Sequence, residues 1–327
     1  MDNQITLSRV ANSLYWMGRH SERAESLIRI LDAHLKLSMD LSTGTQYFWK
    51  AILSAVGCLD SYTEKYKTIE RDNVLHTLIL DSECSESLLN VIWHARENAR
   101  SIRERITAEM WLDINELYLR ISGFSESPKL DGDALLELLD DLKLRTRSFQ
   151  GGWFHTMSHN KEWQFSQLGM YIERTDQISR IIDNFHRTLT ELKDDASTSL
   201  FKWRAVLDSL SATEMYQKTY GVMTVNSILE FVFLNNELPR SIRFSIQAAH
   251  TALLNITENK GGSFQSNVEK KLGRMKANFD FIDIKEISQF GIEEYNERIQ
   301  SRIAEVHDLI KITFFELSEE KVLSYTN

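Results

Sequence analysis

Apolar residues recur at steps of three and four along nearly the whole chain, and strict alternation of apolar and polar positions is almost absent. The clearest stripe consists of Leu14, Met17, Ala24, Ile28, Leu31 and Leu35. At about 100° per residue these positions share one face of an α-helix. The pattern therefore predicts an all-α protein, with helices at 7–38, 46–67, 70–80, 85–121, 132–157, 161–192, 199–219, 222–235, 239–258, 265–280 and 284–317.

Three stretches rich in Gly, Ser, Asp or Pro interrupt this pattern, at 122–133, 193–198 and 258–263. Such residues favour turns and end helices. Together with the repeat described next, they predict a first helical repeat at 1–125, a linker and connecting helix at 126–158, and a second helical repeat at 159–327.

Segments of the two halves resemble each other. The stretch GRHSERAESLIRILD at 18–32 aligns with GMYIERTDQISRIID at 169–183, an offset of 151. Two later blocks align at an offset of 154, for example Trp49 with Trp203 and Ala95 with Ala249. Blocks in one order with nearly one offset indicate an internal duplication. We therefore expect two tandem pseudo-repeated units packed into one elongated helical bundle, because amphipathic helices need partners to bury their apolar faces.

Each aligned segment carries a line of charges next to its apolar stripe. In the first half the line is Gly18, Glu22, Glu25, Arg29 and Asp32, and in the second half it is Gly169, Glu173, Asp176, Arg180 and Asp183. Steps of four, three, four and three place each set along one side of a helix. Glycine at the head of each line allows another backbone to approach closely.

Two interpretations of these lines stay open. Glu and Arg at such spacings form ordinary ion pairs within a helix, each contributing about 0.2–0.5 kcal/mol. Alternatively, the lines face each other around a polar cleft, because facing helices commonly build ligand sites. On the second interpretation, Glu22 and Glu173 pair with arginines, and Arg96 or Arg100 are further candidates for that role.

A second group of charges lies in ARENARSIRERITAEMW, at 95–111. Arg96, Arg100 and Arg103 share one side of the predicted helix and suit a carboxylate or phosphate, although a solvated face explains them equally. Glu109 lies near the apolar side and is a candidate buried carboxylate. The predicted polar site thus collects Arg19, Glu22, Arg23, Glu25, Arg29, Arg96, Arg100, Glu109, Glu173, Arg174, Asp176 and Arg180.

Composition narrows the class of protein. The chain has 327 residues and a net charge of −9, which disfavours nucleic acid as a partner. Its beginning lacks a signal-peptide pattern, and no apolar run approaches the roughly 20 residues of a membrane span. Cys58 and Cys84 form no ligand motif and are read as free thiols. We therefore expect a cytoplasmic protein that binds no membrane.

Signals for a metal, a cofactor or a nucleophile are weak. His155 and His159 lie four residues apart with Glu162 one turn on, but the glutamate of a zinc protease motif is missing. The chain contains no phosphate-binding loop, dinucleotide fingerprint or nucleophile elbow. We therefore predict no metal and no cofactor, and no residue is assigned a catalytic role.

Three stretches that contain the motifs described above resemble the alpha-E superfamily, also called domain of unknown function 403. They are LSRVANSLYWMGRHSERAE at 7–25, ARENARSIRERITAEMW at 95–111 and WQFSQLGMYIERTDQISRIID at 163–183, so the resemblance covers essentially the whole chain. It departs from the expected pattern at His20, His159 and Glu162.

The resemblance implies an all-helical protein that works beside others. Members of this family are encoded with, or fused to, ATP-grasp proteins, which join a carboxylate to an amine, and they also lie near transglutaminase-like proteins. We therefore expect a helical partner of a peptide or amide-bond modification system that binds a peptide, an amino acid or a protein through its Glu/Arg lines. The alternatives are a stand-alone enzyme with acid/base carboxylates between the repeats, or a structural bundle that forms homo-oligomers.

Overall fold

The chain folds as a bundle of α-helices, as predicted. The computed structural model describes residues 2–40, 46–125, 132–192, 196–259 and 263–316, and no strand occurs in these ranges. The helices are α1 (Asp2–Asp40), α2 (Gln46–Val56), α3 (Leu59–Lys65), α4 (Arg71–Ile79), α5 (Leu88–Ser101), η1 (Arg103–Arg105), α6 (Ala108–Ser125), α7 (Gly132–Thr156), α8 (Lys161–Leu192), α9 (Ala196–Ser209), α10 (Thr213–Tyr220), α11 (Val225–Leu234), α12 (Ile242–Thr257), α13 (Asn267–Phe281), α14 (Ile284–Phe290), α15 (Ile292–Ile310) and η2 (Lys311–Phe315).

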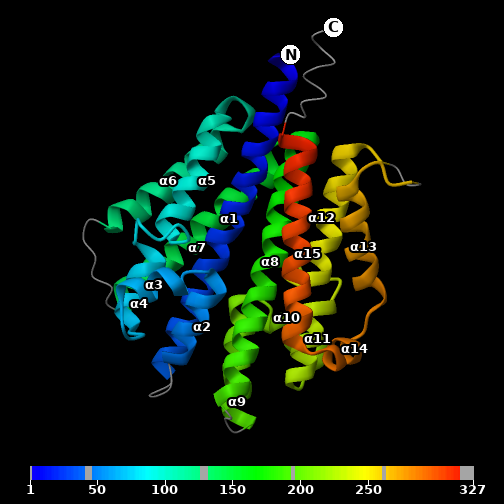
Figure 1. Cartoon of the computed structure of the whole chain (residues 1–327). Helices are drawn as coiled ribbons and strands as arrows, with labels where there is room; N and C mark the ends of the chain where they lie inside the picture. Colours follow the sequence, from blue (N-terminus) through cyan, green and yellow to red (C-terminus); the bar gives the residue numbers. More distant parts are fainter. Residues whose placement is uncertain (1, 41–45, 126–131, 193–195, 260–262, 317–327) are drawn as a thin grey trace.

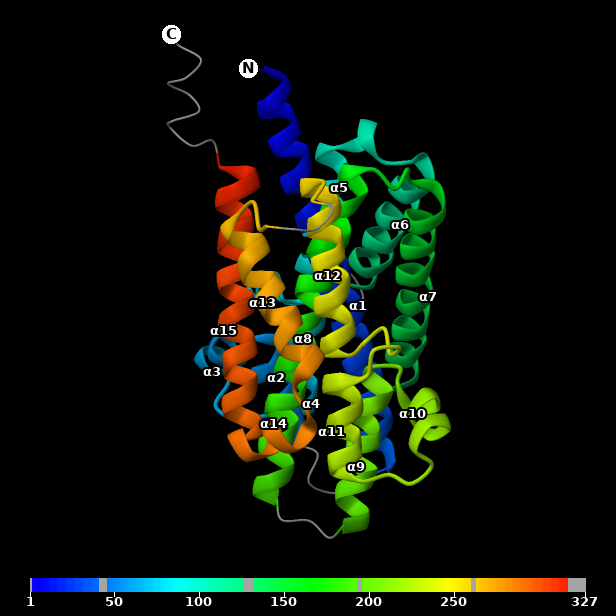
Figure 2. The same ribbon diagram turned by 90° about the vertical axis from the view of Figure 1, so that its right-hand side faces the viewer.

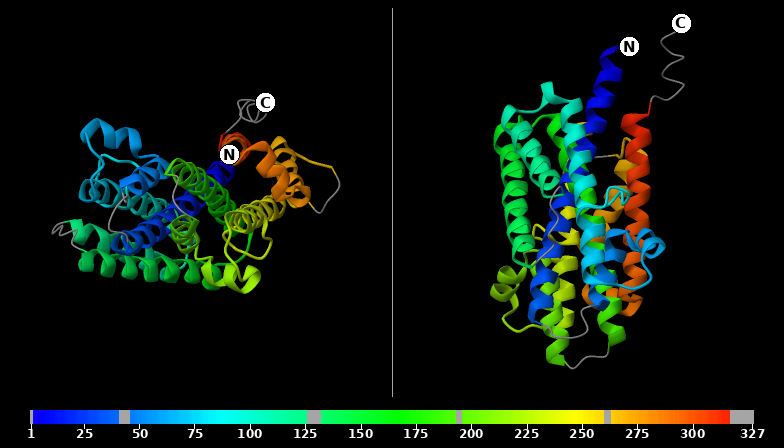
Figure 3. Two further views of the ribbon diagram at one scale, coloured as in Figure 1. Left: turned by 90° about the horizontal axis from the view of Figure 1, so that it is seen from below. Right: turned by 90° about the vertical axis from the view of Figure 1, so that its left-hand side faces the viewer.

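Two long helices, α1 and α8, lie side by side in the middle of the bundle (Figure 1). They run in the same direction, since Tyr15 contacts Gly169 and His34 contacts Phe185 further along both helices. Helices α5 and α7 pack on α1, whereas α12 and α15 pack on α8. The end-on view in Figure 3 shows α1 and α8 between these two groups of helices.

The predicted apolar stripe of the first helix forms part of the core. Its six members, Leu14 to Leu35, are all buried, and Leu14, Met17, Ile28 and Leu31 are 0% exposed. Burying one such side chain contributes roughly 1.5–3 kcal/mol. The hydrophobic effect therefore holds α1 inside the bundle, and the charged line beside the stripe is carried inside with it.

Glycines let α1 and α8 touch at their backbones. A Cβ atom on Gly18 would lie 2.2 Å from the carbonyl oxygen of Ser166, and one on Gly169 would lie 2.1 Å from the carbonyl oxygen of Tyr15. Both distances are far below a normal contact, so any side chain at either position would push the helices apart. This close approach is what the glycine at the head of each charged line predicts.

Three predicted helices are each two helices, because the backbone turns sharply inside them. Gly57, with φ of 87°, separates α2 from α3 within the predicted range 46–67. Gly291, with φ of 100°, separates α14 from α15 within 284–317. Ser211, with φ of 52°, lies between α9 and α10 within 199–219. A residue in this region of φ cannot continue a right-handed helix.

The predicted helix 85–121 is also wrong as one helix. The helix α5 ends at Ser101, the short 3₁₀ turn η1 follows, and α6 begins at Ala108. Thr107 starts the new helix, since its hydroxyl accepts a hydrogen bond from the backbone N–H of Met110 at 3.3 Å. In this first turn Met110 is buried and Glu109 is exposed, so the prediction of a buried Glu109 carboxylate is wrong.

Half of each predicted break, namely 126–131, 193–195 and 260–262, lies outside the described residues. Next to them α6 ends at Ser125, α8 ends at Leu192 and α12 ends at Thr257. Within the other halves, 122–125, 132–133 and 196–198 belong to α6, α7 and α9, so these parts of the predicted breaks are wrong.

The fold brings the two cysteines together. Both are free thiols and buried, and Cys58 Sγ lies 2.8 Å from Cys84 Sγ between the α2–α3 corner and the segment before α5. The hydrogen bond from Cys58 lowers the pKa of the Cys84 thiol to about 7.

Candidate functional site

The α1–α8 contact is crossed by two reciprocal ion pairs. Arg174 of α8 donates from Nε and Nη2 to the two carboxylate oxygens of Glu22, at 2.9 and 2.7 Å. Arg23 of α1 donates from Nε and Nη2 to the two oxygens of Glu173, at 2.6 and 3.1 Å. Each helix thus supplies one glutamate and the arginine that follows it. Both glutamates are 0% exposed, so these are buried interhelical pairs.

Each buried glutamate has a second arginine. Arg19 donates from Nε to Glu173 at 2.7 Å, and Arg240, in the segment between α11 and α12, donates from Nη1 to Glu22 at 2.8 Å. The other terminal nitrogen of Arg240 lies 2.8 Å from a carboxylate oxygen of Glu25. Neither glutamate is left with an uncompensated charge, which would be costly inside a protein.

The neighbouring arginines keep the carboxylates of Glu173 and Glu25 ionised. Burial by itself would raise the pKa of Glu173, but the charges of Arg23 and Arg19 outweigh it and hold the pKa well below its usual range. Arg240 and Arg29 overcome the effect of burial on Glu25 in the same way. The pKa of Asp176 is raised instead, because burial outweighs its one strong partner.

Further along both lines, each acid also pairs with the arginine four residues on in its own helix. Arg29 donates from Nε to Glu25 at 2.8 Å, and Arg180 donates from Nε to Asp176 at 2.9 Å, each across four residues. Ordinary ion pairs within one helix are thus present, as the first interpretation predicts. Of the second interpretation, the structure has Glu22 and Glu173 paired with arginines of the other helix, but both carboxylates are fully buried and do not face a cleft. Glu25 makes both kinds of contact, since it also pairs with Arg240.

The arginines of the second predicted group do not join this cluster. Arg96 donates to Asn115 and Glu97 at 2.8 Å each, and Arg100 donates to Glu97 at 2.6 Å. Arg103 lies beyond the end of α5, with its guanidinium 5.0 Å from the ring of Trp111. The expectation that Arg96 or Arg100 pairs with Glu22 or Glu173 is wrong, because a neighbouring acid on α5 already satisfies them.

Two residues of the cluster were missed in the sequence. Arg240 contacts Glu22 and Glu25, and Glu86 accepts from Arg23 Nη1 at 2.5 Å. They are related by the offset of 154 that aligns the later blocks. The alignment of the two halves did not reveal them, because it matched residues of the same type and these two side chains carry opposite charges.

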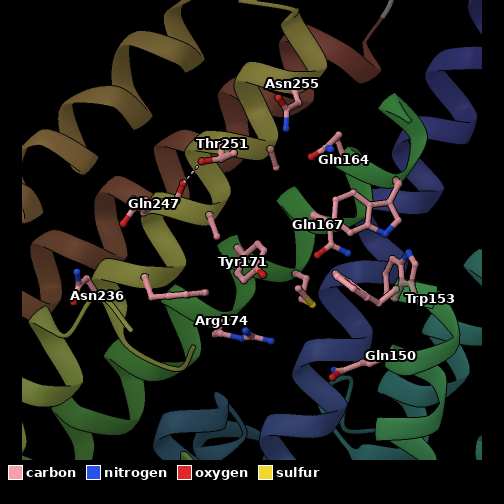
Figure 4. A pocket seen from close by; sticks show the side chains of 16 residues that line it. Gln150, Trp153, Gln164, Gln167, Tyr171, Arg174, Asn236, Gln247, Thr251 and Asn255 are labelled. Carbon is pink, nitrogen blue, oxygen red and sulfur yellow. Dashed lines mark hydrogen bonds between the residues drawn. The ribbon is translucent and has the colours of Figure 1, made fainter. Parts of the chain in front are cut away.

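A pocket of about 560 Å³ opens beside this cluster, between α7, α8 and α12. Figure 2 shows α7 and α12 standing apart on this side of the bundle. Arg174 reaches from the ion pair with Glu22 into the pocket lining (Figure 4). The lining residues are Gln150, Trp153, Phe154, Trp163, Gln164, Gln167, Met170, Tyr171, Arg174, Asn236, Phe244, Gln247, Ala248, Thr251, Ala252 and Asn255. Arg174 is the one charged side chain among them.

Side-chain amides dominate the polar part of the lining. Gln150 is held by Glu25, to which its Nε2 donates at 2.5 Å. The other amides make no side-chain hydrogen bond with any described residue; they are Gln164, Gln167, Asn236, Gln247 and Asn255. Gln164 and Gln167 lie on α8, Gln247 and Asn255 lie eight residues apart on α12, and Asn236 lies two residues after the end of α11 (Figure 4).

Indole groups form another part of the wall. Trp153 is 2% exposed, and its Nε1–H is buried without a hydrogen-bond partner among the described residues. The Nε1–H of Trp163 is in the same situation. Since buried donors are nearly always paired in proteins, these two enclosed N–H groups are unusual, and both belong to side chains that line the pocket.

Of the two histidines considered as a metal face, His159 packs on a tryptophan that lines the pocket. The ring of His159 stacks on Trp163 with 4.0 Å between ring centroids, and its Nε2 lies 2.9 Å from the carbonyl oxygen of Phe154. In the described part of the chain, no three His, Cys, Asp or Glu side chains gather as a metal-binding group.

Among the helices described, none is both long and apolar enough to cross a lipid bilayer.

Comparison with known proteins finds relatives whose function is also open. Uncharacterised proteins from Mycobacterium bovis and from two strains of Mycobacterium tuberculosis are 19% identical to this chain over 330 residues, which is 94% of this chain. The chain spans 37% of the length of these relatives. No solved structure matches the chain.

A protein family matches almost the full length. The Alpha-E model, described as a predicted alpha-helical domain with a conserved ER motif, covers residues 6–315. The Glu–Arg dipeptides at 22–23 and 173–174 are the residues that exchange ion pairs between α1 and α8. This protein belongs to the Alpha-E family.

Proposed function

We propose that this chain is the ligand-binding component of an amide-bond modification system that works with an ATP-grasp ligase, and that the pocket beside Arg174 binds an amino acid or a short peptide. One observation carries the proposal. Five side-chain amides, on Gln164, Gln167, Asn236, Gln247 and Asn255, line this pocket without any partner among the described residues.

Amides suit a ligand that itself contains amides. Each side-chain amide offers two donors and an acceptor, which complement the C=O and N–H of a peptide group. Gln167 is buried and Gln164 is half-buried, whereas Asn236, Gln247 and Asn255 are exposed, so these amides can exchange water for the donors and acceptors of a ligand. The rings of Trp163, Tyr171 and Phe244 supply apolar contact area. The volume of about 560 Å³ lies within the range of roughly 300–1,000 Å³ that small-molecule sites occupy.

In this proposal the buried ion pairs position the pocket and do not contact a partner protein. Glu22 and Glu173 are 0% exposed, so no docking protein can reach them. Their task is to hold α1 against α8 and to fix the guanidinium of Arg174. A site built on rigid helices and supported from behind loses less entropy on binding than a site on loops.

Glu173 and Glu25 are poor candidates for acid/base catalysis. A general base works best when its pKa lies near the working pH. The arginines around Glu173 hold its pKa far below that range. Both of its carboxylate oxygens already accept hydrogen bonds from Arg19, Arg23 and Gln177. A binding role therefore accounts for the geometry better than a stand-alone enzyme does.

The partners in this proposal come from the family resemblance. An ATP-grasp ligase would join a carboxylate to an amine, and a transglutaminase-like protein would act on the same amide chemistry. Such a system needs ATP, which is the reason for expecting it in the cytoplasm. A pull-down from the native host that recovers no ATP-grasp protein would remove this part of the proposal.

We also propose that the chain arose by internal duplication, with residues 7–121 equivalent to about 160–281. Support comes from the reciprocal ion pairs, from the matching glycine contacts, and from the parallel packing of α5 on α1 and of α12 on α8. Superposing the two halves tests this proposal, and different helix paths in the two halves would end it.

The ligand proposal is tested by native mass spectrometry. The full chain is incubated with a mixture of the amino acids and an equimolar library of tripeptides, and any retained species is identified by mass. Gln167→Met and Gln247→Met remove pocket amides at similar volume, and Gln217→Met is a matched control on the exposed side of α10. We expect retention by wild type and control and at least a tenfold loss in the pocket variants. Equal retention by all proteins contradicts the proposal.

A further inference from the structure

We infer that the ligand of this pocket carries a carboxylate, and that the carboxylate binds the guanidinium of Arg174. The inference rests on the proposed function, because it specifies the chemistry of the ligand in the same pocket. An amino acid and a peptide with a free C-terminus share this group.

The first argument is the charge balance around Arg174. The connected ion pairs on this side join Arg29, Arg174 and Arg240 to Glu22 and Glu25, which is three positive charges against two negative ones. The difference, 3 − 2, leaves one positive charge in a largely buried cluster. Because an unbalanced buried charge is unfavourable, an anion in the adjacent pocket would be stabilised there.

The opposite side of the α1–α8 pair is balanced. There Arg19, Arg23 and Arg180 pair with Glu86, Glu173 and Asp176, so the difference is 3 − 3, or zero. The excess positive charge is therefore a property of the pocket side alone.

The second argument is that some N–H groups of the Arg174 guanidinium have no acceptor among the described residues. Its Nε and Nη2 donate to Glu22, and its Nη1 donates to the carbonyl oxygen of Pro239 at 3.2 Å. A guanidinium carries more N–H groups than these three, and the others have no partner among the described residues. The planar arrangement of arginine donors fits a carboxylate well. No acidic side chain in the described lining competes for them.

The third argument is the surplus of buried donors on the pocket wall. The Nε1–H of Trp153 belongs to a side chain that is only 2% exposed, and it has no acceptor. The ring of Trp153 lines the pocket while its Nε1 atom is enclosed, so this unpaired N–H contributes a partial positive charge near the pocket wall, which favours an anion there. Figure 4 shows Arg174 and Gln150 at the opposite end of the pocket from Gln164 and Asn255, so the pocket has a charged end and a neutral end.

The test compares two libraries that differ only in charge. One contains N-acetylated tripeptides with a free C-terminal carboxylate, and the other contains the same tripeptides with a C-terminal amide. Binding to the full chain is measured by native mass spectrometry and then by calorimetry on the retained sequences. We expect the acids to bind at least tenfold more tightly than the matched amides, and the difference to shrink as salt is added.

Two arginine variants locate the effect. Arg174→Lys keeps the charge but loses the forked donors, and Arg23→Lys makes the same change in the reciprocal pair away from the pocket. We expect Arg174→Lys, but not Arg23→Lys, to reduce the preference for acids. Equal binding of acids and amides by the wild type would overturn the carboxylate inference and leave the proposed function standing. Binding of neither library would overturn both. The library comparison uses the wild type, so it holds even where a variant does not fold.

Discussion

The two sides of the α1–α8 pair carry the same charged dipeptide but differ in what surrounds it. On one side Arg174 borders an open pocket of about 560 Å³. On the other side, the space near Arg23 is filled by stacked rings. His20 lies 5.4 Å from Trp16 and 5.1 Å from His94, measured between ring centroids.

In the alignment of the two halves, two of these three ring residues match smaller or more flexible side chains, while His20 matches Tyr171. The offset of 151 places Gln167 at the position of Trp16, and the offset of 154 places Ala248 at the position of His94. Gln167 and Ala248 both line the pocket. The reciprocal Glu–Arg ion pairs occur on both sides and therefore do not create the pocket by themselves. The side chains next to them determine whether the space is filled.

Removing one charge from either reciprocal pair should have the largest effect. Glu22→Gln and Glu173→Gln each leave two arginines without their carboxylate in a buried interface, and breaking such a pair costs about 3–5 kcal/mol. Urea unfolding should show this loss for both variants. The control is Glu97→Gln, which removes ion pairs on the partly exposed surface of α5 and should cost less than about 1 kcal/mol.

The comparison between the two sides makes this test sharper. The side of Glu173 is neutral, so Glu173→Gln creates a net charge there, whereas Glu22→Gln adds to an existing excess. If Glu22→Gln leaves the unfolding midpoint unchanged, the ion pair does not hold the fold, and the charged line is tuned for ligand binding instead.

Widening the contact between the two helices should have the next largest effect. Gly18→Ala and Gly169→Ala each place a Cβ atom about 2 Å from a carbonyl oxygen of the other helix, so the backbones must separate. Overpacking of this kind costs roughly 1–3 kcal/mol. Gly151→Ala is the matched control in α7, where a Cβ atom meets nothing within 4 Å. Thermal unfolding that ranks Gly151→Ala with the other two would show that the close backbone contact is unimportant.

The apolar periodicity was sufficient to predict the helical class and the apolar face of the first helix, which is buried. It could not show where helices break, because Gly57 and Ser211 lie inside stretches whose apolar spacing continues without a gap. Helix breaks of this kind depend on the φ angle of one residue, which the spacing of its neighbours does not reveal.

The charged cluster was predicted in part for a similar reason. Spacing on one helix placed Glu22 and Glu173 on lines beside the core, and both lie at the interface. Spacing also suggested Arg96 and Arg100, but Glu97 on the same helix neutralises them locally. Arg240 belongs to a segment between helices, and nothing in its local sequence indicates which distant carboxylate it meets.

Lowering the pH should reduce the free energy of unfolding mainly through histidines on the side with the stacked rings. Burial and the charge of Arg23 lower the pKa of His20 to about 3, and burial lowers the pKa of His307 to about 4, from an ordinary 6.5. Below pH 6.5 the unfolded chain therefore binds more protons than the folded chain, and stability falls as the pH falls. His20→Phe should reduce this loss by on the order of 1–2 kcal/mol at pH 5.

The offset of 151 supplies the control for this experiment, since Tyr171 of the pocket side aligns with His20. Tyr171→Phe should leave the dependence of unfolding free energy on pH between 7.5 and 5 unchanged. An equal change in both variants would mean that the histidine stack is not the group that titrates.

Substituting the cysteine pair should have the smallest effect on stability. It extends the comparison of the two halves to the region of the α2–α3 corner. The offset of 154 aligns Cys58 with Ala212 and Cys84 with Leu238, so a thiol contact in the first half stands where the second half has aliphatic side chains. If the thiols serve only as packing, Cys58→Ala should cost about 1 kcal/mol or less.

Thiol reactivity separates packing from chemistry at this pair. The pKa of Cys84, at about 7, means that protonation does not prevent its reaction at pH 8. Its 3% exposure does, because a reagent in solution cannot reach the sulfur atom without local opening. We therefore expect an aromatic disulfide reagent to react about 100-fold more slowly with the native chain than with the chain in urea, where both thiols react. Equal rates would show that the segment between α4 and α5 opens readily, so that burial does not protect the thiols of the first half.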